Sequence, residues 1–531
     1  MTGPMTVKKA WSHEIPAGDW DYVVIGSGMG GMAAAGILAK LGKRVLVLER
    51  HLIPGGFTQT FKRPGYRWDV GVHIIGEMTD RSYPGRLLKE LSGGLLRWES
   101  VGQIYDEFNF PDGFTIQFPD SRQAFRETLF ESFPDEGEAI DGYLELVRRG
   151  ARATAKYFQM KAVPVLLGAQ RKKATSAASW FLNQTVSQVL GSLTDNERLK
   201  AVLSAQWGYY GATPDEASFA MHALMVSHFM YGAHYPVGGA GRIAETMLSE
   251  VAAKGGWTAV RRSVEEILVQ GGRVVGVRLS DGTEVKTKRV ISTAGGVQTA
   301  AMLKDGLPGT VETSYRTAGV AHVSLYLGFK GDIEAAGANR WCQWFYDQWD
   351  MEVSRWDVHP DQPVGRVPVL FCSFPSLKDP AHEPGEELRH TGEAITFVPW
   401  ESFEKWEGSR WKKRPDDYER FKAALTEKLL ADYLEHYPEL EPMIDYVELS
   451  TPLTTSHFTD AFEGSIYGLG TEPGRFVDDT LGPKTALKGL YLGGQDASAP
   501  GVVGALSGGV LAALAAEPVK ALRFIAPIMK G

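Results

Sequence analysis

The stretch DYVVIGSGMGG at residues 21–31 decides the fold, because it joins a short apolar strand to a glycine-rich turn. A helix-forming run, residues 32–40, follows the turn, and a second apolar strand, residues 44–49, follows that run. A strand, turn, helix and strand at these lengths predict a βαβ unit.

The glycines of this turn fit the GxGxxG pattern of a dinucleotide-binding unit. Gly26 makes the tight turn, Gly28 lets a pyrophosphate approach the backbone, and Gly31 allows the helix to pack closely on the strand; Gly30 lies between them. The amides at the start of the helix can face the diphosphate. We therefore predict a Rossmann-type nucleotide-binding domain and an α/β fold class.

An acidic residue, Glu49, ends the second strand 23 residues after Gly26. A carboxylate at this position can accept hydrogen bonds from the adenosine ribose hydroxyls. The next segment, RHLIPGG at residues 50–56, contains Arg50 and the close pair Gly55 and Gly56. Such a pair lets the backbone approach the rest of an extended dinucleotide, which favours FAD over NAD as the cofactor.

A second glycine-rich block lies at the opposite end of the chain, with YLGGQD at residues 491–496 and PGVVGA at residues 500–505. Together with residues 21–56, it resembles the large FAD family that includes amine oxidases, phytoene desaturases and Rab GDP-dissociation inhibitors. The resemblance implies these FAD-contacting positions: Gly494, Asp496 at the ribityl or diphosphate region, and the backbone of Val264 at the adenine. It also implies that a helix starting near Val503 and Gly504 points its positive end at the flavin.

Two further motifs resemble the retinol saturase and carotenoid isomerase branch of the phytoene desaturase group. These are WDVGVHIIG at residues 68–76 and HYPVGGAG at residues 234–241. Residues 57–61, FTQTF, depart from the small residues or cysteines of the saturase pattern, which leaves the substrate open.

The order of segments indicates two domains, each built from separate parts of the chain. With 531 residues the chain is too long for one ordinary core. Helical patterns between residues 85 and 233 and most tryptophans between residues 311 and 470 indicate an α+β substrate-binding domain, residues 85–234 and 311–470. The FAD-binding domain is then expected at residues 1–84, 235–310 and 471–531.

Composition limits the partners and the compartment. A formal net charge of −8 without a basic tract argues against nucleic-acid binding. The two cysteines, Cys342 and Cys372, are too few for a disulfide framework and are expected to be buried thiols. Neither a secretory signal, a membrane span nor an HExxH metal motif is evident, so we expect a cytoplasmic protein without a metal.

Two residues at the expected domain crossings are candidates for catalysis, His73 and Tyr235. The crossings should converge on the flavin, which would place His73, His228, His234 and Tyr235 near the inner end of a substrate pocket. The alternative for His73 is a hydrogen-bonded structural histidine, and His228 and His234 could equally be core residues.

The sequence predicts redox chemistry on C=C or C–C bonds of a long apolar unsaturated molecule, such as a carotenoid, retinoid or unsaturated fatty acyl lipid. Desaturation, saturation and cis/trans isomerisation remain open, and the electron donor or acceptor is not identified. The alternatives are an oxidase of the amine-oxidase type and a prenyl-binding or lipid-binding escort protein of the GDP-dissociation-inhibitor type.

Residues 157–168 combine apolar side chains with the basic cluster Arg171, Lys172 and Lys173 that follows. This pattern suits peripheral contact with a membrane surface. A buried helix that ends in a solvated charged turn is the alternative.

Overall fold

A six-stranded parallel sheet forms the nucleotide-binding half of the computed structural model, which describes residues 9–162, 168–308, 317–477 and 482–530. The sheet order is β1-β11-β3-β2-β15-β21, and every neighbouring pair is parallel. The strands are β1 (Trp11–Ser12), β2 (Tyr22–Ile25), β3 (Val45–Glu49), β11 (Trp257–Val260), β15 (Val290–Ser292) and β21 (Leu490–Leu492).

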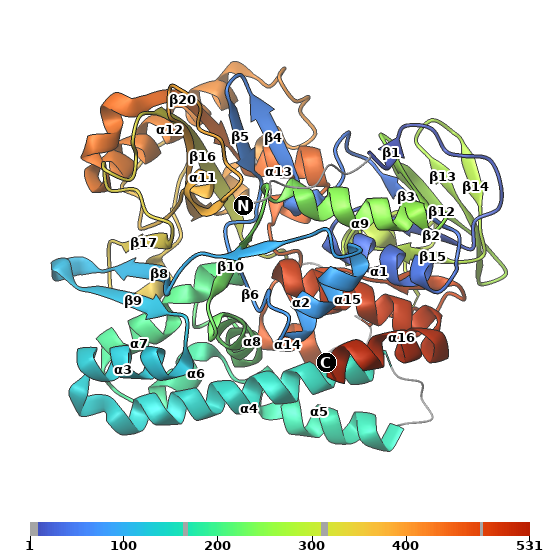
Figure 1. The fold of residues 1–531 in the computed structure, drawn as a ribbon, viewed down its shortest axis with the longest axis horizontal. Coiled ribbons are helices and arrows are strands. Elements are labelled where there is room, and N and C mark those ends of the chain that lie inside the picture. Colours follow the sequence, from blue (N-terminus) through green and yellow to red (C-terminus); the bar gives the residue numbers. More distant parts are fainter. Residues whose placement is uncertain (1–8, 163–167, 309–316, 478–481, 531) are drawn as a thin grey trace.

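Helices cover one face of this sheet. The helices are α1 (Met29–Lys40), α9 (Gly241–Ala253) and α15 (Gly501–Ala516). A three-stranded antiparallel sheet of β12 (Val264–Gln270), β13 (Arg273–Leu279) and β14 (Glu284–Lys286) packs on the other side through a shared apolar core. The first and last parts of the chain thus meet in one domain, as Figure 1 shows in blue and red. The Rossmann-type fold predicted from residues 21–49 is confirmed.

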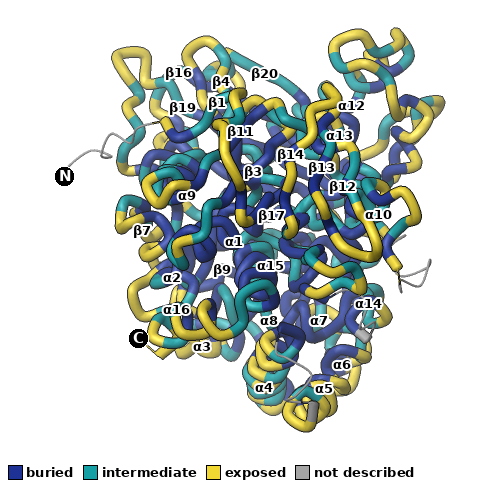
Figure 2. The backbone as a smooth tube through the Cα atoms, turned by 90° about the vertical axis from the view of Figure 1, so that its right-hand side faces the viewer, coloured by how far each residue is buried: buried dark blue, intermediate teal, exposed yellow. Residues whose placement is uncertain are grey.

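A seven-stranded sheet forms the other half, in the order β20-β16-β19-β18-β17-β8-β9. Its strands are β8 (Ile104–Asn109), β9 (Thr115–Pro119), β16 (Ala321–Lys330), β17 (Cys342–Tyr346), β18 (Val369–Ser373), β19 (Arg389–Val398) and β20 (Ile444–Ser450). The pairs are antiparallel except β8 with β17, which is parallel. The central strands are buried along almost their whole length. Figure 2 shows that buried residues, in dark blue, fill the interior and that exposed ones, in yellow, lie around it.

Helices enclose both faces of this second sheet. A helical layer packs on one face and α12 (Asp416–His436) packs on the other. The layer consists of α3 (Arg122–Ser132), α4 (Gly137–Lys161), α5 (Gly168–Asn183), α6 (Val186–Gly191), α7 (Glu197–Ser204) and α8 (Phe219–Phe229).

Short strands link the two halves. The hairpin of β4 (Thr60–Arg63) and β5 (Tyr66–Asp69) packs its aromatic side chains against Tyr326 of the seven-stranded sheet. A small sheet joins β6 (Ile75–Gly76), β10 (Ala233–Pro236) and β7 (Trp98–Ser100). The remaining helices are α2 (Tyr83–Leu91), α10 (Gly296–Ala301), α11 (Pro375–Lys378), α13 (Pro452–Thr459), α14 (Pro473–Val477) and α16 (Pro518–Lys530).

The segment from residue 85 to residue 233 is mostly helical, as expected, but it also contains strands. Besides α3 to α8 it contains β7, β8 and β9. β8 and β9 form a hairpin within this segment, and β8 joins it to the seven-stranded sheet by pairing with β17, more than 200 residues later. The limits of the two domains stay a prediction.

Candidate functional site

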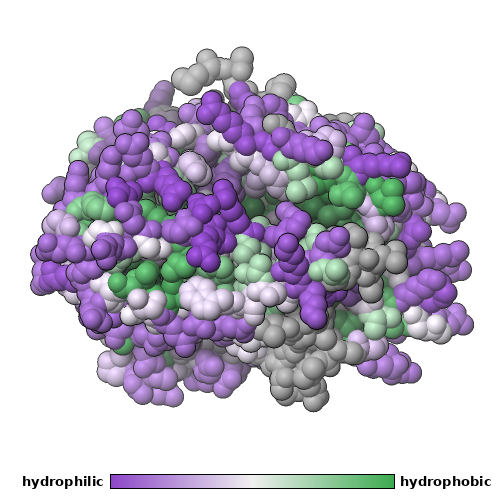
Figure 3. All heavy atoms as spheres, turned by 90° about the horizontal axis from the view of Figure 1, so that it is seen from below, coloured by the Kyte–Doolittle hydropathy of each residue, from purple (hydrophilic) through white to green (hydrophobic). Residues whose placement is uncertain are grey.

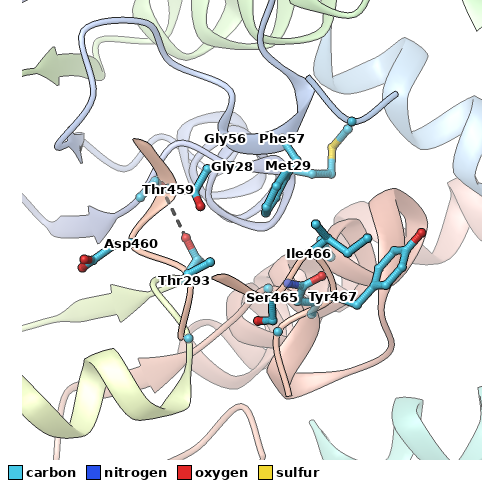
Figure 4. Close-up of a pocket in the computed structure, with 18 of the residues that line it drawn as sticks. Gly28, Met29, Gly56, Phe57, Thr293, Thr459, Asp460, Ser465, Ile466 and Tyr467 are labelled. Carbon is cyan, nitrogen blue, oxygen red and sulfur yellow. Dashed lines mark hydrogen bonds between the residues drawn. The ribbon is translucent and has the colours of Figure 1, made fainter. Parts of the chain in front are cut away.

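A deep cavity lies where the carboxyl ends of the parallel strands face the seven-stranded sheet. Ligands of open α/β sheets bind at this edge. The cavity is lined by ten residues that the sequence indicated for FAD: Gly26, Gly28, Gly30, Glu49, Arg50, Gly55, Gly56, Val264, Gly494 and Asp496. Figure 4 shows Gly28, Met29 and Gly56 on one side of it and Ser465, Ile466 and Tyr467 on the other.

The turn after β2 shapes the end of the cavity. Gly26 has φ +92, a backbone conformation that glycine adopts without strain. A Cβ on Gly28 would meet no described atom within 4 Å, whereas one on Gly31 would collide with the carbonyl oxygen of Gly26. Gly28 therefore borders empty space and Gly31 serves helix packing, as the GxGxxG pattern predicted. Within the described residues no side chain caps the N-terminus of α1, so its first amides face the cavity unused.

Glu49 is buried and organises the loops around it. Its Oε2 accepts hydrogen bonds from the Ser27 amide at 3.0 Å and from Ser27 Oγ at 2.6 Å, and its Oε1 accepts from the His51 amide at 2.7 Å. Ser27 Oγ accepts in turn from the Gly55 amide at 3.0 Å. One carboxylate thus ties together the glycine turn, the end of β3 and the Gly55 loop.

Arg50 connects the two halves of the molecule at the cavity. Its guanidinium forms an ion pair with Asp460, which follows α13 and has left-handed backbone geometry at φ 59. Nearby, the His51 and Phe458 rings meet edge to face with centroids 5.0 Å apart. The structure therefore joins Arg50 to the opposite wall, a contact that the sequence did not predict.

Asp496 lies at the cavity with its carboxylate already hydrogen-bonded. Oδ2 accepts from the Gly296 amide at 2.8 Å and Oδ1 accepts from the Leu469 amide at 3.1 Å. Val503 and Gly504 lie in the first turn of α15, but the residues of that helix that line the cavity are Gly501, Val502 and Ala505. The α15 N-terminus faces the cavity, and no side chain among the described residues caps it.

The part of the cavity farther from the glycine turn is apolar and aromatic. The wall comes mainly from one face of the seven-stranded sheet. It consists of Tyr209, Trp344, Phe371, Ile395 and Phe397. The sequence indicated that aromatic residues could belong to a substrate site, but it did not identify these five.

His73 lies at this apolar wall. Its ring contacts Phe371 edge to face at a centroid distance of 5.0 Å, and Nδ1 is 3.3 Å from Oε2 of Glu393. The orientation of the two groups does not satisfy hydrogen-bond geometry, and Nδ1 has no partner among the described residues. Burial, together with the charge of Lys378 and with His322, lowers the pKa of His73 to about 3, so the ring is neutral.

Tyr235, His228 and His234 lie away from the cavity that His73 lines. Tyr235 donates a hydrogen bond to Asp69, and both residues line a second, polar cavity. His228 Nε2 accepts from the Gly76 amide at 2.9 Å. His234 is part of the small sheet that links the two halves. The expectation that all four residues converge at the inner end of one pocket is not met, because His73 lines the first cavity, Tyr235 lines the second, and neither His228 nor His234 lines either of them.

The cavity fits FAD by its own chemistry. The glycine turn leaves room beside Gly28, and two uncapped helix N-termini provide amides for a diphosphate and for the electron-rich side of a flavin ring. The cavity also extends past these groups to the aromatic wall, so a substrate can lie beyond the cofactor.

Known proteins are similar along nearly the whole chain. The model of the flavin-containing amine oxidoreductase family matches residues 29–516. An all-trans-retinol 13,14-reductase of Homo sapiens is 34% identical, over 95% of this chain and 87% of its own. One from Danio rerio is 33% identical, over 92% of this chain and 84% of its own. A chloroplastic prolycopene isomerase of Daucus carota is 27% identical, over 93% and 79% respectively.

Solved structures of other oxidoreductases share the fold. Cyclohexylamine oxidase from Brevibacterium oxydans has a TM-score of 0.58 and 18% identity, and covers 96% of this chain and 100% of its own. An oxidoreductase from Methanosarcina mazei has a TM-score of 0.60 and 16% identity, covering 92% and 98%. At such identities the likeness concerns the fold alone.

Proposed function

Because the chain belongs to the flavin-containing amine oxidoreductase family, and is therefore an FAD-dependent oxidoreductase, we propose that it acts on C=C or C–C bonds of an apolar polyene. The substrate class is that of retinoids and carotenoids. Reduction, desaturation and isomerisation all belong to this class of reaction.

The aromatic wall of the cavity carries this proposal. Trp344, Phe371 and Phe397 offer flat apolar surfaces, which a conjugated chain can contact over its length. Relatives named for retinol and prolycopene, two polyenes, support the same class.

FAD, when bound, accepts or donates the hydride of such a reaction. We propose that the turn of Gly26, Gly28, Gly30 and Gly31 holds its diphosphate and that Glu49 contacts the ribose. The neighbouring contacts would come from Arg50, Gly55, Gly56, Val264, Gly494 and Asp496. Val503 and Gly504 would act only by forming the first turn of α15.

We propose that His73 touches the substrate and that Tyr235 has a positioning role. The side chain of His73 is 14% exposed while its Nδ1 is buried, so the rest of the ring reaches the cavity. Tyr235 reaches no such surface and acts through its hydrogen bond to Asp69.

Product analysis with defined substrates tests the function. The purified protein, loaded with FAD, is incubated with all-trans-retinol, prolycopene or cyclohexylamine under oxidising and reducing conditions, and products are separated by chromatography. Conversion of a polyene is the expected result. Peroxide release with cyclohexylamine and unchanged polyenes would contradict the proposal in favour of an amine oxidase.

Peripheral contact with a membrane would give such a substrate a route to the cavity. Among the described residues, no helix has both the length and the apolar character to cross a bilayer. Residues 163–167 of the segment that suggested surface contact lie outside the described residues. Exposed apolar side chains do occur at the lower end of Figure 1, namely Trp180 on α5 and Val519, Leu522 and Met529 on α16. Figure 3 shows this end, with apolar areas separated by hydrophilic ones.

Vesicle flotation at low salt tests this contact. Vesicles that contain an anionic lipid should carry the wild-type protein upward, and the combined Leu522→Gln and Val519→Gln variant should float less. Equal flotation of both proteins, or none, would contradict contact through α16.

A further inference from the structure

A row of buried polar side chains crosses the seven-stranded sheet beside the aromatic wall. Strand pairing places Asp106, Cys342, Ser373 and Glu393 on the same face as Trp344 and Phe371, because paired residues share a face and neighbours alternate. All four are buried. The apolar wall of the cavity therefore ends at a set of groups that can hold or transfer protons.

Glu393 has the least satisfied side chain of this row. It is 1% exposed, and neither carboxyl oxygen has a hydrogen-bond partner among the described residues. Burial, reinforced by the nearby charge of Asp69, raises the pKa of Glu393 well above its usual value, while Lys378 opposes this. Burial thus favours the neutral, protonated form of this side chain.

Other ionisable groups also face this acid. Lys378 of α11 is fully buried, and its Nζ donates to Ser373 Oγ at 2.5 Å and to Cys342 Sγ at 3.2 Å. Tyr326 of β16 lies opposite Glu393 in the sheet. His322, also on β16, lines the cavity, and burial lowers its pKa to about 4. None of these contacts is a hydrogen bond to the Glu393 carboxyl group.

Glu393 lies between two cavities. On one side its Oε2 is 3.3 Å from Nδ1 of His73, which lines the cavity assigned to FAD. On the other side β5, which ends at Asp69, packs on β19. Asp69 lines the polar second cavity, where it accepts hydrogen bonds from Tyr235 and from the Ala240 amide. Burial raises the pKa of Asp69 to about 6, despite the lowering effect of the Tyr235 hydrogen bond.

We propose that Glu393 and His73 form a proton relay, which supplies from the second cavity the proton needed when a C=C bond of the substrate is reduced. This inference rests on the proposed function. One carbon of the double bond takes a hydride from reduced FAD as the π bond breaks, and the electron pair left on the other carbon takes the Nε2 proton of His73. The proton of Glu393 moves at the same time to Nδ1.

The relay balances atoms and charge. The C=C bond becomes CH–CH, FAD returns to its oxidised form, and Glu393 becomes a carboxylate. Glu393 then regains a proton from the side of Asp69, and His73 stays neutral throughout, as its lowered pKa requires. The poor alignment of Glu393 with His73 is compatible with this, since catalytic hydrogen bonds are often long until ligands bind.

Infrared spectroscopy of the FAD-loaded protein without substrate tests the protonation of Glu393. The carbonyl stretch of neutral carboxylic acids, identified by its shift in heavy water, should be present at neutral pH and lose intensity in Glu393→Gln, while the contribution of Asp106, whose pKa burial raises to about 7, remains. Glu107→Gln is the matched control, because Glu107 lies on the opposite face of the same sheet, next to Asp106. An unchanged acid band in Glu393→Gln would overturn the inference.

Single-turnover reduction of all-trans-retinol tests the transfer itself. Glu393→Gln should slow the step on the order of 100-fold, within the range of general acid catalysis, while the apparent KM and FAD binding stay the same. The solvent deuterium isotope effect of the wild type should be lost or altered in the variant. A variant as fast as the wild type and the Glu107→Gln control, with an unchanged isotope effect, would overturn the relay.

The two experiments separate the relay from the proposed function. A wild type that converts a polyene without reducing a C=C bond overturns the relay alone. If the wild type converts neither all-trans-retinol nor prolycopene under oxidising or reducing conditions, the proposed function is contradicted. In that case the relay to a polyene is overturned too, while the infrared band still establishes whether Glu393 is a neutral acid. A loss of folding in Glu393→Gln would be detected by its melting temperature, and Glu393→Asp, which keeps the acid, should then recover part of the rate.

Discussion

Single glycines of the 26–31 turn serve two different purposes, which their sequence pattern does not separate by itself. Gly28 has φ −63 and ψ 176, a conformation open to alanine, and its missing side chain leaves free space at the cavity. Gly31 lacks space because its missing side chain faces the carbonyl of Gly26. One glycine is thus needed for the ligand and the other for the fold.

Gly28→Ala and Gly31→Ala should therefore differ in outcome. Gly28→Ala should leave the melting temperature of the apoprotein unchanged but abolish FAD binding, because the added methyl group occupies the approach to the diphosphate. Gly31→Ala should lower the free energy of unfolding by about 1–3 kcal/mol through overpacking. Differential scanning fluorimetry and fluorescence titration with FAD measure the two effects. Equal loss of stability in both variants would refute the distinction.

Glu49 illustrates a residue whose chemistry was predicted but whose contacts were not. Glu49→Ala should weaken FAD binding by about 1.5–3 kcal/mol, the range of a charge-assisted hydrogen bond. It should also lower apoprotein stability, because Ser27 and the His51 amide lose their acceptor. Glu427→Ala, an exposed site on α12, is the control. Normal flavin absorbance after gel filtration of Glu49→Ala would exclude the ribose assignment.

Among the elements, the βαβ unit could be predicted from the sequence, whereas the central strands of the seven-stranded sheet could not. The βαβ unit follows from residues 21–49 because its strands, turn and helix are consecutive. The strands β16 and β18 are buried on both faces and so lack the alternation that identifies a strand. The burial of β19 also explains why the sequence did not identify Glu393 as a neighbour of His73.

The segment that follows α13 forms part of the far wall of the cavity, and the ion pair between Asp460 and Arg50 connects it to the opposite wall. Asp460→Asn keeps a residue that tolerates the left-handed conformation but removes the ion pair. FAD should dissociate up to about fivefold faster, corresponding to the roughly 0.2–1 kcal/mol of an exposed pair, with an unchanged melting temperature. Stopped-flow exchange of bound FAD measures this rate.

The control for that rate is a similar pair far from the cavity, Arg126 with Asp141. Asp141→Asn removes a carboxylate of comparable exposure, 53% against 51% for Asp460. An equal rate of FAD exchange in both variants and the wild type would show that the contact between the two walls does not retain the cofactor.

At the scale of the whole molecule, the buried acids beside the aromatic wall influence how the free energy of unfolding depends on pH. Asp106 is fully buried and accepts hydrogen bonds from Gln206 at 3.0 Å and Tyr209 at 2.7 Å. Burial raises its pKa from 3.8 to about 7, although these hydrogen bonds and that of Trp344 lower it. The folded protein therefore holds a proton on Asp106 at pH values where the unfolded chain has lost it.

Protonated Asp106 therefore adds to the free energy of unfolding at low pH, and this contribution is lost at higher pH. Its contribution to the free energy of unfolding is complete below about pH 4 and is lost as the pH rises to about 7, because the unfolded chain binds fewer protons over that range. Asp106→Asn resembles the neutral acid at every pH. The variant should thus gain stability relative to the wild type between about pH 4 and 7, by at most about 1.4 kcal/mol per pH unit, and then level off. Urea unfolding of both proteins at a series of pH values measures the difference, and a constant difference across that range would mean that Asp106 is ionised in the folded protein.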